Sequence, residues 1–548
     1  MLLTGGQAVV HTLYQEGVRC VFGIPGVHNL AIYDALAEFP DLQHFVTRHE
    51  QGAAFMADGY ARASGKVGVV LVTTGPGALN TLTPALEAYG CSSPVLIISS
   101  QITSKYHGQG KGLLHEVENQ LAMFRPVTAQ QRYVDEVAAI PETIHELLHG
   151  MRAGRPRPAY LEIPFDVLNK EAEVDLGRPR EVIRPAATAA EVRAIVEALR
   201  GAERPLIVCG GGVISSGGTS ELLALLELVP AAVTTSLNGR GAIPEDHPLA
   251  CGALVAQAPI KEYLASCDFV LALGTKFCDR STQTWTTPYS KNLIHVNIDA
   301  GEFNKNYPCR LGVAADAATV LRQVRGELEG KAVAASREVE KEISSRKREV
   351  FAALREEHPT VDAALRDLRQ ALPRESCLVM DMTLLSYWCR THYEVYGPST
   401  FVQPIGSGTL GAALPLAIGA KIARPERQVF VVCGDGGFLF TCQEYATALR
   451  YGLELPILLF NDNKYGAIEW FQQNRYDRVV DATLANPDFM KFADAFGVEG
   501  VRISSLHELP GAIRFAARKG GPVIIETSIS FEPPWDPASL RPKKRVAS

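Results

Sequence analysis

The feature that most constrains this fold is a recurring alternation of short apolar runs with longer amphipathic segments. Short apolar runs are typical of strands that are buried on both faces, and the segments between them have the apolar spacing of helices. This pattern predicts parallel sheets covered by helices, because a parallel strand pair needs a crossover connection. The expected strands are Val67–Val72, Val95–Ile98, Pro158–Pro164, Leu206–Cys209, Phe269–Leu273, Val429–Cys433, Pro456–Phe460 and Val523–Thr527, and one expected helix runs from Glu50 to Ala63.

The length of 548 residues is too great for one hydrophobic core, so several domains are expected. The fold class we predict is α/β, with three doubly wound parallel-sheet domains. A polar, proline-bearing stretch from about 169 to 187 is expected to link the first two. The predicted boundaries are 1–168 for the first domain, 188–330 for a central Rossmann-like domain, 331–358 for a charged helical connector, 359–535 for the third domain and 536–548 for a basic tail.

Composition and charge exclude several functional classes. The net charge of −6 provides no basic face, so we expect no nucleic-acid partner. No apolar run approaches the roughly 18 residues of a membrane span, and the start of the chain lacks a secretory signal pattern. The 11 cysteines are scattered without a Cys-x-x-Cys pair, which favours reduced thiols and a cytoplasmic location.

In the predicted third domain (the third block of the chain), two polar turns follow neighbouring strands. Gly434–Gly437 (Gly-Asp-Gly-Gly) follows one strand, and Asn461–Lys464 (Asn-Asp-Asn-Lys) follows the next. Open α/β sheets bind ligands at the carboxyl ends of their strands, and glycines with a following helix start suit a phosphate. Asp435 and Asp462 supply the carboxylate pair that Mg²⁺ prefers beside phosphate oxygens. The third block is therefore predicted to hold a diphosphate through Mg²⁺.

At this spacing the two turns resemble the metal-binding motif of thiamine diphosphate enzymes. The resemblance implies three metal ligands, namely Asp435, Asp462 and the backbone carbonyl of Lys464. Asp462 stands where the family more often has Asn, so an oxygen ligand is kept and a charge is added. Whether Asn461 or Asn463 joins the ligands stays open.

The first block carries a second set of motifs, which resembles the pyrimidine-binding domain of the acetolactate synthase superfamily. The resemblance implies that Glu50 contacts N1′ of the aminopyrimidine, so that the cofactor forms its ylide by internal proton transfer. The motifs are Phe22–Gly26, Arg48–Ala54, Ala57–Arg62 and Thr74–Gly77, in this order along the chain.

The resemblance also assigns the remaining cofactor contacts. The segment Gly406–Gly411 resembles the one that bends the cofactor, with Leu410 as the wedge and the Gly408 carbonyl as acceptor for the 4′-amino group. Further expected contacts to the cofactor are Thr74, Thr383, Gly434, Gly436, Gly437 and Tyr465.

Resembling enzymes form this site between subunits, which implies a homodimer at minimum and predicts a homotetramer. In acetolactate synthases and pyruvate oxidases the central domain binds FAD, whereas resembling decarboxylases keep the domain without flavin. The segments Gly210–Gly212, Gly239–Gly241 and Gly274–Arg280 echo parts of the flavin site. A lone glycine-rich turn is weak support, so the expectation favours no flavin, with FAD as the alternative.

The reaction implied is decarboxylation of a 2-oxo acid to an enamine, which is then protonated to release an aldehyde. A histidine side chain can exchange a proton near neutral pH, and His28 and His115 are the predicted proton-transfer groups. The segments Gly110–Gly112 and Leu114–Glu116 resemble 5-guanidino-2-oxopentanoate (2-ketoarginine) decarboxylases and depart from acetolactate synthases. A cationic substrate tail would need an acidic partner, for which Glu469, Glu116 and Glu118 are candidates.

Three alternatives stay open. An acetolactate synthase-type carboligase would join the enamine to a second 2-oxo acid, and a flavin-linked pyruvate oxidase would oxidise it. A catalytically silent cofactor-binding subunit is disfavoured, because Glu50 and Asp435 are both present.

Overall fold

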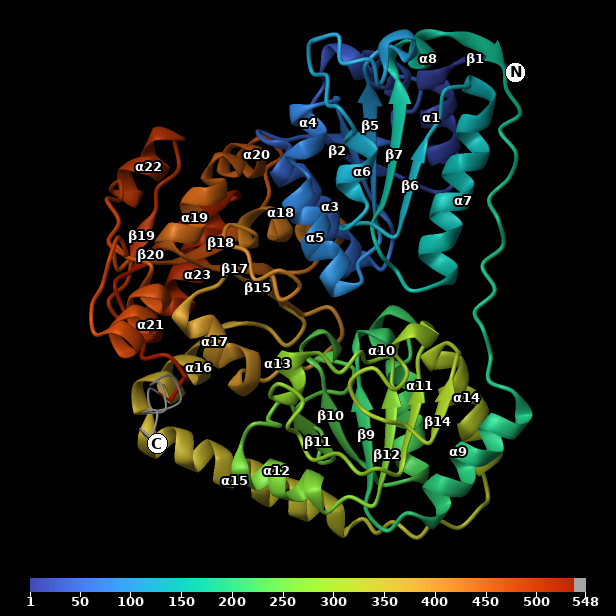
Figure 1. Ribbon diagram of the computed structural model, residues 1–548. Helices are drawn as coiled ribbons and strands as arrows, with labels where there is room; N and C mark the ends of the chain where they lie inside the picture. Colours follow the sequence, from blue (N-terminus) through green and yellow to red (C-terminus); the bar gives the residue numbers. More distant parts are fainter. Residues whose placement is uncertain (537–548) are drawn as a thin grey trace, which may run out of the picture. The chain divides into compact units, whose positions relative to one another are not determined.

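The computed structural model describes residues 1–536 and contains three six-stranded parallel sheets, which confirms the predicted α/β class (Figure 1). Residues 537–548, nearly all of the predicted basic tail, lie outside the described part. Among the described residues no helix is long and apolar enough to cross a membrane. The chain divides into two compact units, and each is described by itself. Unit 1 comprises Met1–Arg184, Pro404–Arg427 and Thr441–Leu453, and unit 2 comprises the remaining residues.

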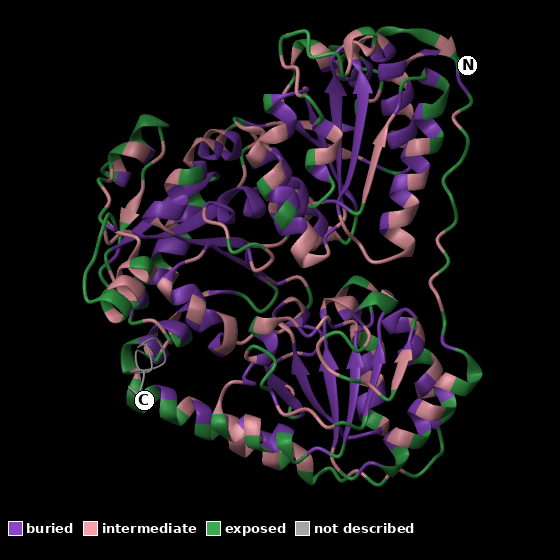
Figure 2. Cartoon of the chain, viewed as in Figure 1, coloured by how far each residue is buried: buried purple, intermediate pink, exposed green. Residues whose placement is uncertain are grey.

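The sheet of unit 1 has the strand order β3-β2-β4-β5-β7-β6. Its central strands β4 and β5 are buried along their whole length, as expected of strands covered on both faces. Figure 2 shows β5 in the colour of buried residues. One face packs against α1, α2 and α7, and α3 packs against the other. The elements are β2 Cys20–Gly23, β3 Gln43–Val46, β4 Gly68–Val72, β5 Val95–Gln101, β6 Gln130–Tyr133, β7 Ala159–Pro164, α1 Gly5–Gln15, α2 Leu30–Leu36, α3 Glu50–Ser64 and α7 Ile140–Ala153.

The helix α3 is held by close contact with α18 (Ala413–Ala423), which comes from the later part of unit 1. A Cβ atom on Gly59 would lie 2.0 Å from the Leu416 carbonyl oxygen, and one on Gly419 would lie 1.9 Å from that of Met56. The two glycines therefore let the helix backbones touch, and this contact fixes the helix that begins with Glu50.

Unit 2 contains two parallel sheets, with strand orders β11-β10-β9-β12-β13-β14 and β16-β15-β17-β18-β20-β19. In each, the chain leaves a central strand first in one direction and then in the other, which makes both sheets doubly wound. The strands are β9 Pro205–Cys209, β10 Ala232–Thr235, β11 Ala250–Gly252, β12 Phe269–Leu273, β13 Leu293–Val296, β14 Leu311–Val313, β15 Cys377–Met380, β16 Phe401–Val402, β17 Val429–Gly434, β18 Leu455–Phe460, β19 Val501–Arg502 and β20 Pro522–Thr527.

Two segments have more structure than the sequence indicated. The expected linker contains β8 (Glu171–Glu173), which pairs antiparallel with β1 (Leu2–Thr4). The expected charged connector is the helix α15 (Glu338–Glu357), whose Ile343 and Val350 are buried in a core of unit 2. The helix has only a sparse stripe of apolar residues, and this stripe is hard to recognise in the sequence because long charged side chains dominate the composition.

Candidate active site

The loops of unit 1 that carry predicted site residues meet where the sheet reverses its strand order. The sheet runs outward from β2 to β3 on one side and from β4 to β5 on the other, so the crevice lies at the carboxyl ends of β2 and β4. The segment with His28 follows β2, and Thr74 follows β4. A Cβ atom on Gly26 would lie 2.9 Å from Thr73, which shows how closely the two loops approach.

Glu50 is the first residue of α3, and its carboxylate is held by a neighbouring amide. The Asn80 Nδ2 donates to Glu50 Oε2 at 2.9 Å. The His49 side chain caps the helix by accepting from the Gln51 N–H at 3.1 Å. The start of the helix therefore fixes both the backbone and the side chain of Glu50.

A buried glutamate that the sequence analysis did not single out, Glu444, supports this helix start. Its carboxylate accepts hydrogen bonds from the N–H groups of Arg48 at 3.2 Å and His49 at 3.0 Å. A Cβ atom on Gly52 would lie 2.4 Å from the same carboxylate, so a larger residue there would displace the Glu444 side chain. Burial raises the pKa of Glu444. Nothing local in the sequence marks Glu444, because its partners lie in a distant motif.

The structure brings His28 and His115 together, with ring centroids 5.3 Å apart. His115 Nδ1 lies 3.1 Å from the Thr74 carbonyl oxygen. Because a carbonyl only accepts, Nδ1 carries the proton and Nε2 is the exchangeable nitrogen. Burial and the neighbouring His115 lower the pKa of His28, whose own Nδ1 is buried without a partner among the described residues.

The side chain of Thr74 turns away from the crevice. Its hydroxyl lies 3.1 Å from the amide oxygens of Gln101 and Gln120, and the residue is fully buried. What Thr74 presents toward the histidines is its carbonyl group. Glu116 is also engaged, since its carboxylate accepts from the N–H groups of Gly112 at 2.6 Å and Leu113 at 2.9 Å.

The glycine-rich segment before α18 is anchored by a second buried acid, Glu87. Its carboxylate accepts from the N–H groups of Gly406 at 3.1 Å and Ser407 at 2.6 Å, and it pairs with Arg62 at 2.9 Å. Gly408 follows with φ +73°, a conformation that favours glycine, and Leu410 is half-buried. The segment is thus held at one end, with Gly408 and Leu410 just beyond the anchor.

The predicted diphosphate turn lies at the corresponding switch point in unit 2, between β15 and β17. A Cβ atom on Gly437 would lie 3.0 Å from the Asp381 carboxylate, and one on Gly434 would lie 3.5 Å from Thr383. Thr383 also caps α17 (Leu384–His392) by accepting from the Ser386 N–H. Larger residues at these glycines would fill the space beside the turn.

The two predicted acidic ligands lie on adjacent turns. Gly434 pairs with Phe460 in the register of β17 and β18, so Asp435 and the Asn461–Asp462 turn emerge side by side. Burial, and then the charge of Asp435, raise the pKa of Asp462 to about 6. Each of two neighbouring carboxylates disfavours the ionisation of the other, and a divalent cation bound between them would offset this repulsion. Residues 1–536 contain no group of three His, Cys, Asp or Glu side chains that could hold a metal, so a cation here would need further oxygen ligands.

The turn after β18 leaves one further oxygen available. Hydrogen bonds from the Tyr465 N–H to Ala482 and from the Leu484 N–H to Asn463 hold the turn, and neither uses the Lys464 carbonyl. Tyr465 lies against Gly436, whose Cβ atom would stand 2.6 Å from the ring.

Asn461 is engaged elsewhere, as its amide donates to Glu526 at 2.8 Å. Asn486, which the sequence analysis did not single out, links the two turns. Its Nδ2 donates to Asp435 Oδ2 at 2.6 Å and to Asn461 Oδ1 at 3.0 Å. The neutral amide of Asn486, rather than a charged side chain, therefore orients the Asp435 carboxylate.

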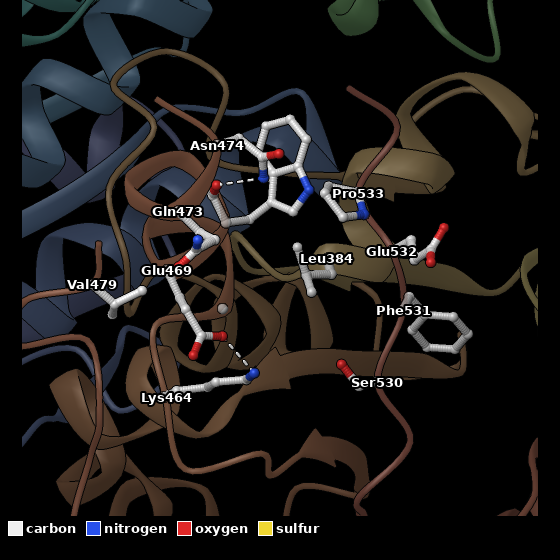
Figure 3. A pocket seen from close by; sticks show the side chains of 12 residues that line it. Leu384, Lys464, Glu469, Gln473, Asn474, Val479, Ser530, Phe531, Glu532 and Pro533 are labelled. Carbon is white, nitrogen blue, oxygen red and sulfur yellow. Dashed lines mark hydrogen bonds and ion pairs between the residues drawn. The ribbon is translucent and has the colours of Figure 1, made fainter. Parts of the chain in front are cut away.

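A cavity of about 380 Å³ opens beside the turn that follows β18 (Figure 3). The helix α21 (Gly466–Tyr476) lines it with one face, because residues three and four apart lie on the same side. Glu469 pairs with Lys464 at 2.5 Å on one wall, and Figure 3 shows Glu532 on the opposite side of Leu384. The lining residues of α21 are Gly466, Glu469, Trp470, Gln473 and Asn474, and the facing wall is 530–533.

In the glycine turns of the central sheet, backbone N–H groups are already engaged by neighbouring backbone carbonyls. The Gly210 and Gly212 N–H groups donate to the carbonyls of Leu273 at 2.8 Å and Gly274 at 3.1 Å. Arg240 is likewise buried, paired with Glu245 at 2.6 Å. These motifs thus have structural partners within unit 2.

Family models match three parts of the chain. The N-terminal TPP binding domain of thiamine pyrophosphate enzymes matches residues 3–123, their central domain matches 192–324 and their C-terminal TPP binding domain matches 381–527. Each match contains one of the three parallel sheets in whole or in part.

Curated relatives match nearly the full length. A probable 2-ketoarginine decarboxylase from Pseudomonas aeruginosa is 38% identical over 96% of this chain and 94% of its own length. A probable acetolactate synthase large subunit from Methanocaldococcus jannaschii is 33% identical over 98% and 93%, respectively. The large subunit of acetolactate synthase isozyme 2 from Escherichia coli is 31% identical over 96% of each chain. With three parallel sheets and these matches, the chain belongs to the thiamine pyrophosphate enzymes of the acetolactate synthase superfamily.

Proposed function

We propose that this enzyme uses thiamine diphosphate and Mg²⁺ to decarboxylate a 2-oxo acid with a guanidino side chain, releasing an aldehyde. The observation that carries the proposal is the His28–His115 pair in the pyrimidine-binding unit, because a non-oxidative decarboxylase must return a proton to carbon. The decarboxylase among the full-length relatives supports the same reaction.

The residues around the β15–β17 switch point fit a magnesium diphosphate. Asp435, Asp462 and the Lys464 carbonyl would be the metal ligands, which agrees with the preference of Mg²⁺ for few carboxylates plus phosphate oxygens. Gly434, Gly436 and Gly437 leave room for phosphate, with Thr383 and Tyr465 beside them.

Thiamine diphosphate, when bound, supplies the electron sink for the electrons that the departing carboxylate leaves behind. Glu50 would hold a proton at N1′ of its pyrimidine, and Asn80 keeps the carboxylate aimed. Leu410 and the Gly408 carbonyl are proposed to orient the two rings.

The histidines would handle the product proton. With Nδ1 bound to the Thr74 carbonyl, His115 can take up or release a proton only at Nε2. His28 lies beside it with a pKa below the usual value, so its charged form gives up a proton readily.

For the side chain of the substrate, we propose the cavity beside α21. Glu116 accepts two backbone N–H groups of its own loop through Oε2, whereas Glu469 lines the cavity and uses Oε2 for Lys464. A carboxylate accepts a guanidinium through charge-assisted hydrogen bonds, and Trp470 offers a ring face for the same group.

The test is CO₂ release across a panel of 2-oxo acids, with the products identified. We expect 5-guanidino-2-oxopentanoate to be turned over with a higher kcat/KM than pyruvate and to give an aldehyde. Acetolactate formed from pyruvate at the higher kcat/KM would instead establish the carboligase, which the acetolactate synthases among the relatives keep as the second candidate.

The N–H groups of Gly210 and Gly212 already donate to carbonyls of the central sheet, so we propose a reaction without flavin. Flavin absorbance in the purified protein would overturn this part of the proposal.

We also propose a homodimer at minimum and a homotetramer in solution, as the resemblance implies. An active monomer in sedimentation experiments would refute that assembly.

A further inference from the structure

Behind the histidine pair, unit 1 contains a fully buried polar network formed by the turn after β4, the end of β5, side chains of β7 and the start of α6. Gln120, the first residue of α6 (Gln120–Phe124), lies at its centre. Phe124 of the same helix stacks on Tyr160 with ring centroids 3.6 Å apart, and this contact anchors α6 over the sheet. The position of Gln120 is therefore set by packing as well as by hydrogen bonds.

The orientation of the Gln120 amide follows from its partners. The Gly75 N–H can only donate, and it lies 2.7 Å from Gln120 Oε1, so this atom is the oxygen. Nε2 on the other side donates to the Tyr160 hydroxyl at 2.7 Å and to Glu162 Oε2 at 3.2 Å. The amide thus connects a buried acid to the backbone of the turn after β4.

That turn is the one that holds His115. Gly75 has φ +64°, and a Cβ atom on it would lie 2.6 Å from the His115 carbonyl oxygen, so the turn and the histidine loop are in contact. The Thr74 N–H donates to Ser100 Oγ at 3.1 Å, and the Thr74 carbonyl faces His115 Nδ1. The Thr74 N–H, the Thr74 hydroxyl and the Gly75 N–H each have a partner, and the Gly75 bond to Gln120 is the shortest of these at 2.7 Å.

We propose that Gln120 is a positioning residue for His115. By holding the Thr74–Gly75 turn from behind, it keeps the Thr74 carbonyl where it binds Nδ1 and so leaves Nε2 to exchange protons with the product. Packing alone cannot supply this function, because an apolar side chain of the same size would leave the Gly75 N–H buried without a partner and would leave Glu162 Oε2 with the Tyr160 hydroxyl alone. The inference rests on the proposed function of His115.

Two variants separate positioning from simple stability. Gln120→Met keeps the length and removes both polar ends, whereas Gln120→Glu keeps an oxygen for the Gly75 N–H. A matched control is Gln131→Met, since Gln131 donates only to Thr128 and has no bond to the turn. All three proteins would be compared with wild type at saturating cofactor, with kcat, KM and the ratio of aldehyde to hydroxyketone product measured for the same 2-oxo acid.

We expect Gln120→Met to lower kcat about 10- to 100-fold, as a misplaced catalytic group does, with KM little changed and a smaller aldehyde fraction. Gln120→Glu should recover part of the loss, and Gln131→Met should match wild type. The inference is overturned if Gln120→Met lowers only the melting temperature, or if Gln120→Glu is no better than Gln120→Met. If His115→Asn leaves kcat and the product ratio unaltered, the proposed function of His115 fails instead.

Discussion

The imidazole rings of His28 and His115 lie 5.3 Å apart, although they stand in separate loops after β2 and β5. The Thr74 carbonyl fixes the tautomer of one ring, and burial lowers the pKa of the other. The pair thus combines one ring with a lowered pKa and one ring with a defined tautomer, and both features suit proton exchange with a product.

The first prediction concerns this pair. His115→Asn should lower aldehyde formation about 100-fold, because Asn cannot exchange a proton at the position of Nε2. His28→Asn should lower it as well. Product analysis by chromatography would show whether CO₂ release falls with the aldehyde. His149→Asn serves as a control, since His149 lies on α7, which belongs to neither loop. Full aldehyde formation in both site variants would contradict the proposal.

The second prediction concerns Glu50. Glu50→Gln should lower kcat about 10²- to 10⁴-fold, because the amide cannot share a proton with N1′ while it still fits beside Asn80. Cofactor binding, followed by tryptophan fluorescence, should persist. A Glu50→Gln enzyme with wild-type kcat would remove Glu50 from the mechanism.

The third prediction concerns the metal ligands. Asp435→Asn should raise the Mg²⁺ concentration for half-maximal activity at least about tenfold, because it removes the charge of a carboxylate that Asn486 orients. Asp462→Asn should be milder, since the amide keeps an oxygen and removes the repulsion that raises the pKa of Asp462. Mg²⁺ titration of chelator-treated enzyme would compare them, and equal defects would argue against distinct ligand functions.

The fourth prediction concerns the substrate cavity. Glu469→Gln should lower the kcat/KM ratio of 5-guanidino- to 5-ureido-2-oxopentanoate about 10- to 100-fold, because the ureido group is a neutral shape match that needs no carboxylate. Glu532→Gln removes the same charge across the cavity and should leave the ratio as in wild type. Equal losses in both variants would indicate a general field effect rather than direct recognition.

The fifth prediction concerns stability in acid. Burial, and then the charge of Arg240, lower the pKa of His392 to about 4, against about 6.5 in an unfolded chain. The neutral ring is favoured in the fold, so its contribution to stability is present above about pH 6.5 and is lost as the pH falls through about 4. The full loss is of the order of 3 kcal/mol. The melting temperature of His392→Gln should therefore fall less than that of wild type when the pH is lowered from about 8 to about 5. A parallel decline in both proteins would contradict this.

Much of the fold could be predicted from local pattern. The apolar runs correspond to β4, β5, β7, β9, β12, β17, β18 and β20, because a strand buried on both faces must be apolar at every position. Asp435 and Asp462 could be paired for the same kind of reason, since both follow neighbouring strands of one parallel sheet.

The supporting residues could not be predicted in this way. Glu444 at the start of α3, Asn486 behind Asp435 and Gln120 beneath Thr74 act through partners that are far away in the chain. No spacing or propensity marks a single buried amide or acid whose partners are backbone N–H groups.

By itself the sequence determined the α/β class, the cofactor family and the two acidic turns, because periodicity and glycine-acid motifs are properties of contiguous residues. The tertiary structure alone decided that His28 meets His115, that Thr74 presents its carbonyl rather than its hydroxyl, and that Glu469 rather than Glu116 lines the cavity. The physical reason is that hydrogen-bond partners and burial arise only when distant segments pack together.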